Sequence, residues 1–234
     1  MDNDKIITAR IEDKLEQCER GSYITTTGFL NMHEQSLAMR IVKGRSDVKS
    51  FFYGGYDDAE RRIIMFVPDG YADTLEGALE MISPLSVLHI KVAPGSRKLT
   101  HRDYLGSVLS LGLDRSVIGD ILVNDKGADM IVNSEIVDFL LSEFHSAGHT
   151  NLQITASDIG ELEVPEQRVK AVRDTLSSPR LDNVVSAAFH VSRSEAVRAI
   201  KGGIVFVNHE EVTKIDKRID EGDTIVLRGK GKAV

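Results

Sequence analysis

The sequence predicts an α+β protein made of three folded regions in series. Two observations support this class: apolar residues recur at helical spacing in several segments, and these segments alternate with short runs rich in β-branched and aromatic residues. At 234 residues the chain is long enough to bury substantial cores. We therefore divide it into an N-terminal α/β region (1–80), a middle domain (81–160), a linker (161–179) and a C-terminal domain (180–234).

Composition excludes several classes of protein. The chain has 29 Lys and Arg against 36 Asp and Glu, so its net charge of −7 excludes a polycation. The most hydrophobic runs end within six residues, far short of the roughly 18 that a membrane helix needs. The acidic start of the chain lacks the pattern of a secretory signal. We therefore expect a cytoplasmic protein that does not contact membranes.

The residues that commonly bind metals give no pattern for a site. The single cysteine, Cys18, allows neither an intrachain disulfide nor a thiolate zinc site. His145 and His149 lie at helical spacing where a helix is expected to end, but no third ligand is evident, and we interpret them as structural. The sequence thus predicts no metal and no cofactor.

The N-terminal region is expected to combine two helices with a β-hairpin. The apolar stripe of the first helix, over 6–20, is Ile7, Ile11, Leu15 and Cys18, and that of the second, over 29–43, is Leu30, Leu37, Met39 and Ile41. Two β-rich runs, Val48–Tyr53 and Arg62–Val67, flank a loop that begins with Gly54-Gly55. The segment from Tyr71 to Ser86 receives no element.

The middle domain shows the order strand, helix, strand, strand, helix, strand. The expected elements are Val87–Val92, Thr100–Leu111, Asp120–Val123, Ala128–Val132, a helix from the cap Asn133 to Gly148 that buries Ile136, Val137, Leu140, Leu141 and Phe144, and Asn151–Ala156. This order matches the ferredoxin-like split β-α-β topology, which also underlies the RNA-recognition fold. The first and third strands lack the paired aromatic residues that stack bases in such sheets, so base stacking is not expected here.

Two helices and two strands are expected in the C-terminal domain. The apolar face of the first helix is Leu181, Val184, Val185, Ala188 and Phe189. Ser192 and Glu195 form a capping box that starts the second helix, and Gly202-Gly203 ends it. Strands follow at Ile204–Asn208 and Thr224–Gly229. In the preceding linker, Gln167–Val172 has the pattern of one strand.

Charge differs between the two ends of the chain. From Arg180 to Val234, ten Lys and Arg stand against eight Asp and Glu, a net of +2, whereas residues 1–179 carry −9. A local excess of cations suits nucleic-acid binding, and the helix amides after Ser192 add partial positive charge. The candidate RNA-binding residues are Arg180, Ser192, Arg193, Ser194, Arg198, Lys201, Asn208, Arg228, Lys230 and Lys232. The alternative is an ordinary solvated surface laced with salt bridges.

The same segment resembles a known RNA-binding domain. Its motifs are Arg180-Leu181-Asp182, Ser192-Arg193-Ser194-x-Ala196, Ile200-Lys201-Gly202-Gly203, Val205-x-Val207-Asn208, Glu221-Gly222-Asp223-x-Ile225 and Arg228-Gly229-Lys230-Gly231. In this order and spacing they closely resemble the alpha-L domain named after ribosomal protein S-four, which we call the S-four domain. The resemblance implies a pair of helices with a few strands, whose helical face docks on structured RNA.

Motifs in the first two regions are similar to those of the YlmH family. They are Gly54-Gly55-Tyr56, Ala59-Glu60-Arg61-Arg62, Lys98-Leu99-Thr100-His101-Arg102-Asp103-Tyr104-Leu105-Gly106, Leu111-Gly112-Leu113-Asp114-Arg115 and Ile118-Gly119-Asp120-Ile121. The resemblance implies an N-terminal α/β region, a ferredoxin-like RNA-binding region and a terminal S-four domain. It also implies association with the large ribosomal subunit and tRNA in ribosome-associated quality control of stalled nascent chains, and genes near cell-division loci.

A second group of candidate RNA contacts lies outside the S-four domain. It comprises Arg61, Arg62, Lys98, His101, Arg102 and Arg115. For the two adjacent arginines the alternative is an ion pair with Asp57 or Asp58. The tripeptide His101-Arg102-Asp103 echoes the kinase catalytic loop, but Val108 stands where that loop requires Asn, which excludes a kinase.

Our hypothesis for function is a monomeric, non-enzymatic protein that docks on ribosomal RNA and tRNA of the large ribosomal subunit. It would act in translation or in ribosome-associated quality control. S-four domains also accompany pseudouridine synthases and tyrosyl-tRNA synthetase, but residues 1–179 lack the signatures of either catalytic domain. Two alternatives stay open: an RNA-modifying enzyme with an unrecognised active site in the middle domain, and a cell-division-linked adaptor.

Overall fold

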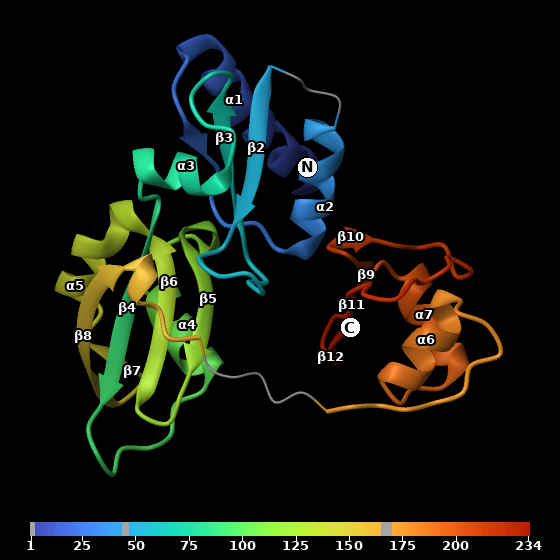
Figure 1. Ribbon diagram of the computed structural model, residues 1–234. Helices are drawn as coiled ribbons and strands as arrows, with labels where there is room; N and C mark the ends of the chain where they lie inside the picture. Colours follow the sequence, from blue (N-terminus) through green and yellow to red (C-terminus); the bar gives the residue numbers. More distant parts are fainter. Residues whose placement is uncertain (1–2, 44–46, 165–169) are drawn as a thin grey trace. The chain divides into compact units, whose positions relative to one another are not determined.

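A computed structural model describes residues 3–43, 47–164 and 170–234, and Figure 1 shows its helices and strands. The chain forms two compact units. The first contains Met1–Asn31 and Ile41–Glu166, so the N-terminal region and the middle domain share one unit. The second contains Met32–Arg40 and Gln167–Val234, and therefore holds the C-terminal domain.

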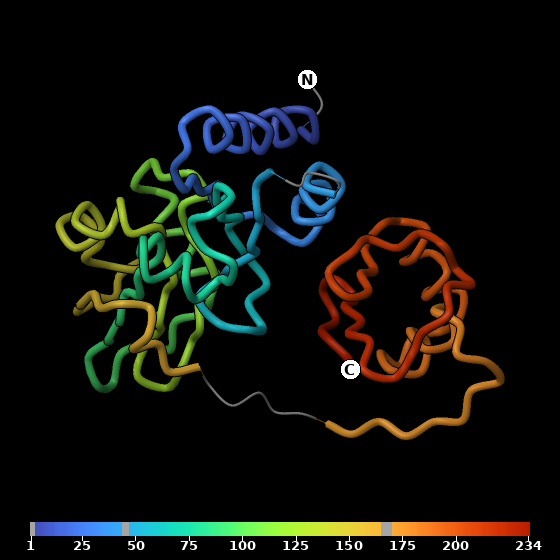
Figure 2. The backbone as a smooth tube through the Cα atoms, turned by 45° about the horizontal axis from the view of Figure 1, so that its top comes forward, coloured from blue at the N-terminus to red at the C-terminus, as the bar shows by residue number. Residues whose placement is uncertain are grey.

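A long helix packs on a small antiparallel sheet in the N-terminal region (Figure 2). Helix α1 (Asn3–Gly21) buries the four residues of its predicted stripe, Ile7, Ile11, Leu15 and Cys18. The sheet has the order β1-β3-β2, with β1 at Thr25–Thr26, β3 at Ile63–Pro68 and β2 at Val48–Tyr53. All six residues of β3 are buried. The first helix and the hairpin are therefore confirmed.

The second helix differs from its prediction. Helix α2 spans Met32–Val42, and its buried residues are Gln35, Ser36 and Ala38 rather than the predicted stripe. Leu30 cannot join this helix because its extended backbone donates a hydrogen bond to the Arg62 carbonyl at 2.8 Å. A third helix, α3 (Leu75–Met81), occupies the segment that received no element, and the Thr74 hydroxyl caps it by accepting from the Gly77 amide at 3.2 Å.

The middle domain contains the expected order of elements on a curled antiparallel sheet, β5-β6-β4-β8-β7. The elements are β4 (Leu85–Val92), α4 (His101–Leu109), β5 (Ile118–Val123), β6 (Gly127–Asn133), α5 (Val137–Glu143), β7 (Ser146–Ala147) and β8 (Thr150–Asp158), with 3₁₀ turns at Arg115–Val117, Ser134–Ile136 and Ile159–Glu161. The short edge strand β7 was not predicted. It pairs with β8 across the turn at Gly148, whose φ is +61°.

The two faces of this sheet have different surroundings. Leu88 and Ile90 of β4 pack with Tyr104 and Val108 of α4 in one core. Because side chains alternate along a strand, the odd-numbered residues of β4 point to the other face. On that face Leu85 packs in a second core with residues of the N-terminal region. His89 lies farther along the same face and pairs in register with Asp129 and Thr155.

Helix α5 is shorter at both ends than predicted. Asn133 caps the 3₁₀ turn Ser134–Ile136, and α5 begins only at Val137. The helix ends at Glu143 rather than at Gly148, because Phe144 leaves the helical conformation with φ −91° and ψ 76°. Leu140 and Phe144 are buried as expected, but the Leu141 side chain is 38% exposed. Its position follows from the helical period, since neighbouring residues lie about 100° apart around the axis.

The second unit carries the predicted pair of helices, α6 (Leu181–Ala188) and α7 (Arg193–Lys201). They share a core with a sheet of order β10-β9-β11-β12. The strands are β9 (Val205–Val207), β10 (Glu210–Glu211), β11 (Ile225–Leu227) and β12 (Gly231–Ala233). The two predicted strands are confirmed in shorter form, and β10 and β12 were missed.

The remaining expectations concern the linker and membrane contact. Of the strand predicted at Gln167–Val172, residues 167–169 lie outside the described part of the chain, and residues 170–172 form no strand. Among the described residues, no helix has the length and apolar character required to cross a bilayer.

Candidate RNA-binding surface

A buried carboxylate organises the start of the S-four segment. The Asp182 side chain, in the first turn of α6, is only 2% exposed. It accepts from Arg180 Nε at 3.0 Å and from Arg193 Nε and Nη2 at 3.0 and 2.9 Å. The side chains of Arg180 and Arg193 are 42% and 63% exposed. Asp182 therefore holds two guanidinium groups in fixed positions at the surface.

The charge state of Asp182 follows from these contacts. Burial raises the pKa of its carboxyl, but the hydrogen bonds and charges of the two arginines outweigh burial and hold the pKa below its ordinary value. The carboxylate is thus ionised at neutral pH. Sequence reasoning assigned Asp182 only to a motif and missed this role, although an acidic residue two positions after Arg180, at a helix start, is a usable signal.

The predicted capping box at the start of α7 is confirmed. Ser192 Oγ accepts from the Glu195 amide at 3.3 Å, and Glu195 Oε2 accepts from the Ser192 amide at 2.8 Å. Hydrogen bonds from Ser192 lower the pKa of Glu195, with smaller contributions from the nearby charges of Arg198 and Lys230. The box fixes where α7 begins and therefore how its basic side chains are spaced.

One cation of α7 and one of the C-terminal hairpin lie near the same carboxylate. Arg198 and Lys230 come from α7 and from the β11–β12 turn, yet both act on the same carboxylate, Glu195. Gly229 and Gly231 have positive φ, which permits the tight turn between the two strands. The sequence analysis assigned no element after Gly229, but Lys232 lies in β12 and pairs with Val226 of β11.

Opposite charges are segregated along the sequence of the domain. The seven candidate cations, counted with Asp182 and Glu195, carry a net charge of +5, and these cations are Arg180, Arg193, Arg198, Lys201, Arg228, Lys230 and Lys232. The domain's other six acidic residues all fall within residues 210–223, which carry three cations and a net of −3. The two carboxylates of the surface thus reduce its positive charge without neutralising it. We call these seven cations with Asp182 and Glu195 the S-four surface.

Asn208 has a structural role at the end of β9. Its φ is +50°, a conformation that asparagine tolerates better than most residues. Its amide donates to Asp223 Oδ1 at 2.7 Å, and its carbonyl accepts from the Thr224 amide at 2.9 Å. These bonds hold β9 and the start of β11 together, so the side chain serves the turn.

Three arginines of the second candidate group are bound to backbone carbonyls. Arg61 donates from Nε to the Ile118 carbonyl at 3.1 Å, and from Nη2 to the carbonyls of Phe29 and Arg115 at 2.8 and 3.2 Å. Arg115 donates to the carbonyls of Ile118 and Gly119. These contacts join the N-terminal region to the start of β5 and give both guanidinium groups a structural role.

Arg62 is held in a similar way. Its Nε donates to the Ala59 carbonyl at 3.0 Å and its Nη2 to the Asp57 backbone carbonyl at 2.6 Å. Nearby, Asp120 accepts from the Tyr56 hydroxyl at 2.9 Å and from the amides of Glu60 and Arg61 at 2.7 and 3.1 Å. Burial lowers the pKa of Arg62 while the acidic residues around it oppose that shift.

The other three members of this group surround the start of α4. Lys98 pairs with Asp125 at 3.1 Å, and both side chains are exposed. Burial, with the charge of Arg115, lowers the pKa of His101, so this imidazole is neutral at pH 7. Arg102 is exposed in the first turn. Asp103 caps the helix by accepting from the Thr100 amide at 2.7 Å, and hydrogen bonds from Thr100 and Arg97 bring its pKa to about 2.

The two histidines placed at helical spacing do not share a helix. His145 follows the end of α5 and His149 lies in the turn between β7 and β8, and both are exposed. Within the described residues, no group of three or more His, Cys, Asp or Glu side chains has the arrangement of a metal site.

Comparison with known proteins assigns the three regions. Residues 3–71 match the model described as "YlmH, N-terminal", residues 84–161 match "Putative RNA-binding domain in YlmH", and residues 179–225 match the S4 domain. A Bacillus subtilis protein named "Ribosome-associated protein quality control protein P2" is 32% identical over 206 residues, which cover 88% of this chain and 78% of that protein. The chain belongs to the YlmH family.

A solved structure shares the fold. The chain titled "Cell division protein ylmH from Streptococcus pneumoniae" aligns with a TM-score of 0.56 at 19% sequence identity, covering 70% of this chain and 96% of that one. At this identity the likeness concerns the fold alone.

Proposed function

We propose that this YlmH-family protein is a non-enzymatic RNA-binding factor of ribosome-associated quality control. It docks through its S-four surface on ribosomal RNA and tRNA of the large ribosomal subunit. The name of the Bacillus subtilis relative supports the pathway, because identity to it extends over most of the chain. The S4 match supports structured RNA as the ligand.

Charge segregation is the observation that carries this proposal. The S-four surface holds a net charge of +5 in a chain whose net charge is −7. Phosphate contacts position a protein on nucleic acid without reading its sequence. If about four to six phosphates are engaged, the logarithm of affinity falls with the logarithm of salt concentration at a slope of about −3 to −5. Arg193, Arg198, Lys201 and the cations of the β11–β12 hairpin supply these contacts, with Arg180 beside Arg193.

The middle domain is proposed as a second RNA-contacting region. Its four longer strands lie in the order β8-β4-β6-β5, which supports assigning it to the ferredoxin-like topology. Lys98, His101 and Arg102 stay in the proposed contact set. Arg61, Arg62 and Arg115 are assigned first to the structural bonds described above. The proposal includes a cytoplasmic monomer without a cofactor, divided at 1–80, 81–160, 161–179 and 180–234.

Matched charge reversals within one domain test the proposal. The variant R198E/K201E reverses two exposed cations of α7, and the control K214E/R218E reverses two exposed cations in the acidic segment 210–223. Each changes the net charge by the same amount. Arg193 is left in place because its loss would remove a partner of buried Asp182. We expect R198E/K201E to abolish co-sedimentation with large ribosomal subunits, while both variants melt within about 2 °C of the wild type.

Equal co-sedimentation of the two variants would contradict the S-four surface as the docking site. The enzyme alternative has its own measurement, which is mass mapping of modified nucleosides in RNA from cells that lack the protein. A missing modification would favour that alternative over a factor that only binds.

A further inference from the structure

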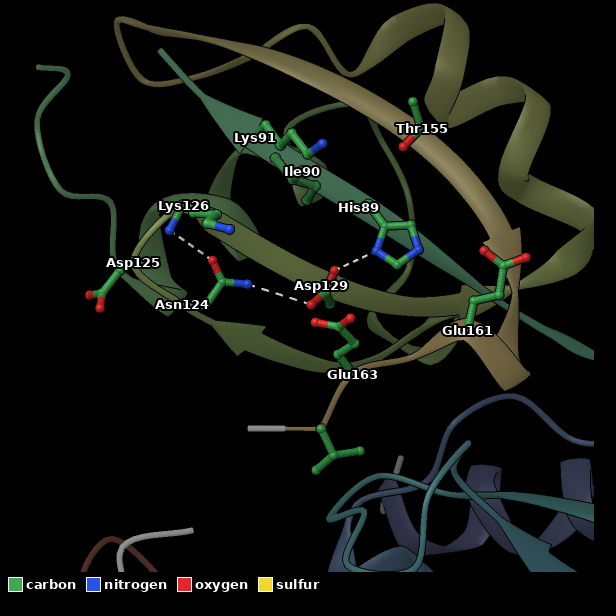
Figure 3. Close-up of a pocket in the computed structure, with 11 residues that line it drawn as sticks. His89, Ile90, Lys91, Asn124, Asp125, Lys126, Asp129, Thr155, Glu161 and Glu163 are labelled. Carbon is green, nitrogen blue, oxygen red and sulfur yellow. Dashed lines mark hydrogen bonds and ion pairs between the residues drawn. The ribbon is translucent and has the colours of Figure 1, made fainter. Parts of the chain in front are cut away.

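A pocket of about 650 Å³ opens on the face of the middle sheet opposite helices α4 and α5 (Figure 3). Its wall is formed by β4, the β5–β6 turn, β6, β8 and the segment after β8. The polar residues that line it are His89, Lys91, Asn124, Asp125, Lys126, Asp129, Thr155, Glu161 and Glu163. Its volume lies in the range of small-ligand sites. The residues of the S-four surface do not line this pocket, so the proposed docking surface does not account for it.

A continuous hydrogen-bond network orders one wall of this pocket. His89 Nδ1 lies 2.6 Å from Asp129 Oδ1, and His89 Nε2 lies 2.9 Å from Ser157 Oγ. Asn124 Nδ2 donates to Asp129 Oδ2 at 3.5 Å, and Asn124 Oδ1 accepts from the Lys126 amide at 2.9 Å. Figure 3 shows the contacts of His89 and Asn124 converging on Asp129. Because the members fix one another, the imidazole and the amide are held in place before a ligand arrives.

The hydrogen bonds run from Ser157 to His89 to Asp129, as they do in the catalytic triad of a serine hydrolase. The serine hydroxyl is nevertheless not presented to the pocket as a nucleophile. Ser157 is absent from the lining of the pocket. Its hydroxyl also lies 3.2 Å from the Asp158 carbonyl. We therefore assign the serine to orienting the His89 ring, which does line the pocket.

The backbone of the β5–β6 turn is held close to β4. Gly127 has φ +154°, and a Cβ atom there would lie 1.9 Å from the Ile90 carbonyl oxygen. Only glycine permits this approach, and the Val92 amide then donates to the Lys126 carbonyl at 3.1 Å. The turn thus places Asn124 and Lys126 at the mouth of the pocket with little freedom.

A second hollow adjoins the first, and the charged residues that line the two hollows differ in sign. It has a volume of about 620 Å³ and shares Lys91, Asn124, Asp125 and Lys126 with the first pocket. Arg97 and Lys98 line only the second hollow, whereas Asp129, Glu161 and Glu163 line only the first. The combined site is therefore basic at one end and rich in carboxylates at the other. No ion pair joins Lys91 or Lys126 to another residue within the described ranges.

We propose that this site binds one unstacked nucleotide of an RNA strand whose base carries an exocyclic amine. Lys91 and Lys126 contact the phosphate. The carboxylates of Glu161 and Glu163 accept from the amine, as acidic side chains do from the N4 amine of cytosine. Such a nucleotide carries an anion and hydrogen-bond donors at opposite ends, which matches the two ends of the site. Phe, Tyr and Trp are absent from the lining of the first pocket, and its one imidazole, His89, is hydrogen-bonded to Asp129 and Ser157, which fits recognition by hydrogen bonds instead of stacking. The inference rests on the proposed function, because it takes RNA as the ligand.

Binding of short oligonucleotides to the full-length chain tests this inference. The assay is fluorescence anisotropy with labelled octamers of cytidylate and uridylate, which differ in the amine at the base edge. It uses the R198E/K201E variant as background, so that the S-four surface contributes little. We expect cytidylate to bind about fivefold more tightly than uridylate, and Glu163→Gln to reduce that preference. K91E/K126E should weaken both octamers about tenfold at low salt.

Glu143→Gln serves as the matched control, because Glu143 is exposed on α5, which packs on the opposite face of the sheet. Equal binding of the two octamers, or loss of preference in the control as well, would overturn the inference. Either result would leave the proposed function standing, because that function depends on co-sedimentation of the intact chain. Conversely, if R198E/K201E still sediments with large subunits, the proposed docking surface fails while the preference for cytidylate can still be measured.

Discussion

Two arginines in each compact unit have opposite kinds of partner. In the second unit, buried Asp182 holds Arg180 and Arg193, whose side chains stay 42% and 63% exposed. In the first unit, Arg61 and Arg115 point their guanidinium groups at backbone carbonyls. A carboxylate partner at the surface leaves a guanidinium able to meet a phosphate, whereas several backbone carbonyl partners direct its donors into the fold. We therefore propose that the partner of an arginine, rather than its presence in a motif, distinguishes the arginines that contact RNA from those with structural roles.

The largest effect on stability is expected from Arg61→Ala. The substitution leaves the carbonyls of Phe29, Arg115 and Ile118 without this donor, and unsatisfied buried groups cost about 1–3 kcal/mol each. We expect urea denaturation to show a loss of about 2–4 kcal/mol in the free energy of unfolding. RNA affinity of the folded fraction should be unchanged. If the variant is as stable as the wild type but binds RNA more weakly, Arg61 contacts RNA, and the proposed difference between the arginines of the two units is wrong.

For Asp182→Asn we expect a smaller loss of stability, together with weaker RNA binding. The change keeps the shape of the side chain but removes the charge that holds two guanidinium groups, so both orientation and stability should suffer. Breaking a buried ion pair costs about 3–5 kcal/mol at most, and the exposure of both arginines reduces that figure. We expect tRNA affinity to fall several-fold in an anisotropy assay. Unchanged affinity would show that Arg180 and Arg193 need no orientation by Asp182.

The pH dependence of stability tests whether the charge of Asp182 stabilises the folded state. The pKa of Asp182 in the folded state lies below its ordinary value of 3.8. Its contribution is therefore fully present above pH 3.8 and is lost as pH falls through the lowered folded-state pKa. Below about pH 4, the stability of the wild type should fall more steeply than that of the Asn variant. Parallel curves would mean that the carboxylate contributes nothing through its charge.

Local patterns predicted much of this fold. The stripe of α1 and the capping box of α7 were both readable, because each depends on residues within a few positions of one another. The hairpin of β2 and β3 and the order of elements in the middle domain follow from the same kind of signal. Family resemblance then assigned all three regions, as the comparisons confirm.

These local patterns could not predict contacts between residues that are far apart in the sequence. The contacts of Arg61 with Phe29 and Ile118 join residues that are far apart in sequence, and no periodicity reports them. The His89–Asp129 network depends on strand register for the same reason. The strand β12 was missed because its three residues, Gly231–Ala233, include no β-branched or aromatic side chain. In each case the sequence pattern does not tell which distant segment of backbone packs beside the residue or strand.

The salt dependence of tRNA affinity tests the central claim most directly. For the wild type, log affinity plotted against log salt should give a slope of about −3 to −5. In R198A/K201A the slope should become shallower by about 1.5, because two phosphate contacts are lost at 0.7 to 0.9 each, while K214A/R218A should match the wild type. An equal slope in all three proteins would contradict phosphate binding by the exposed face of α7.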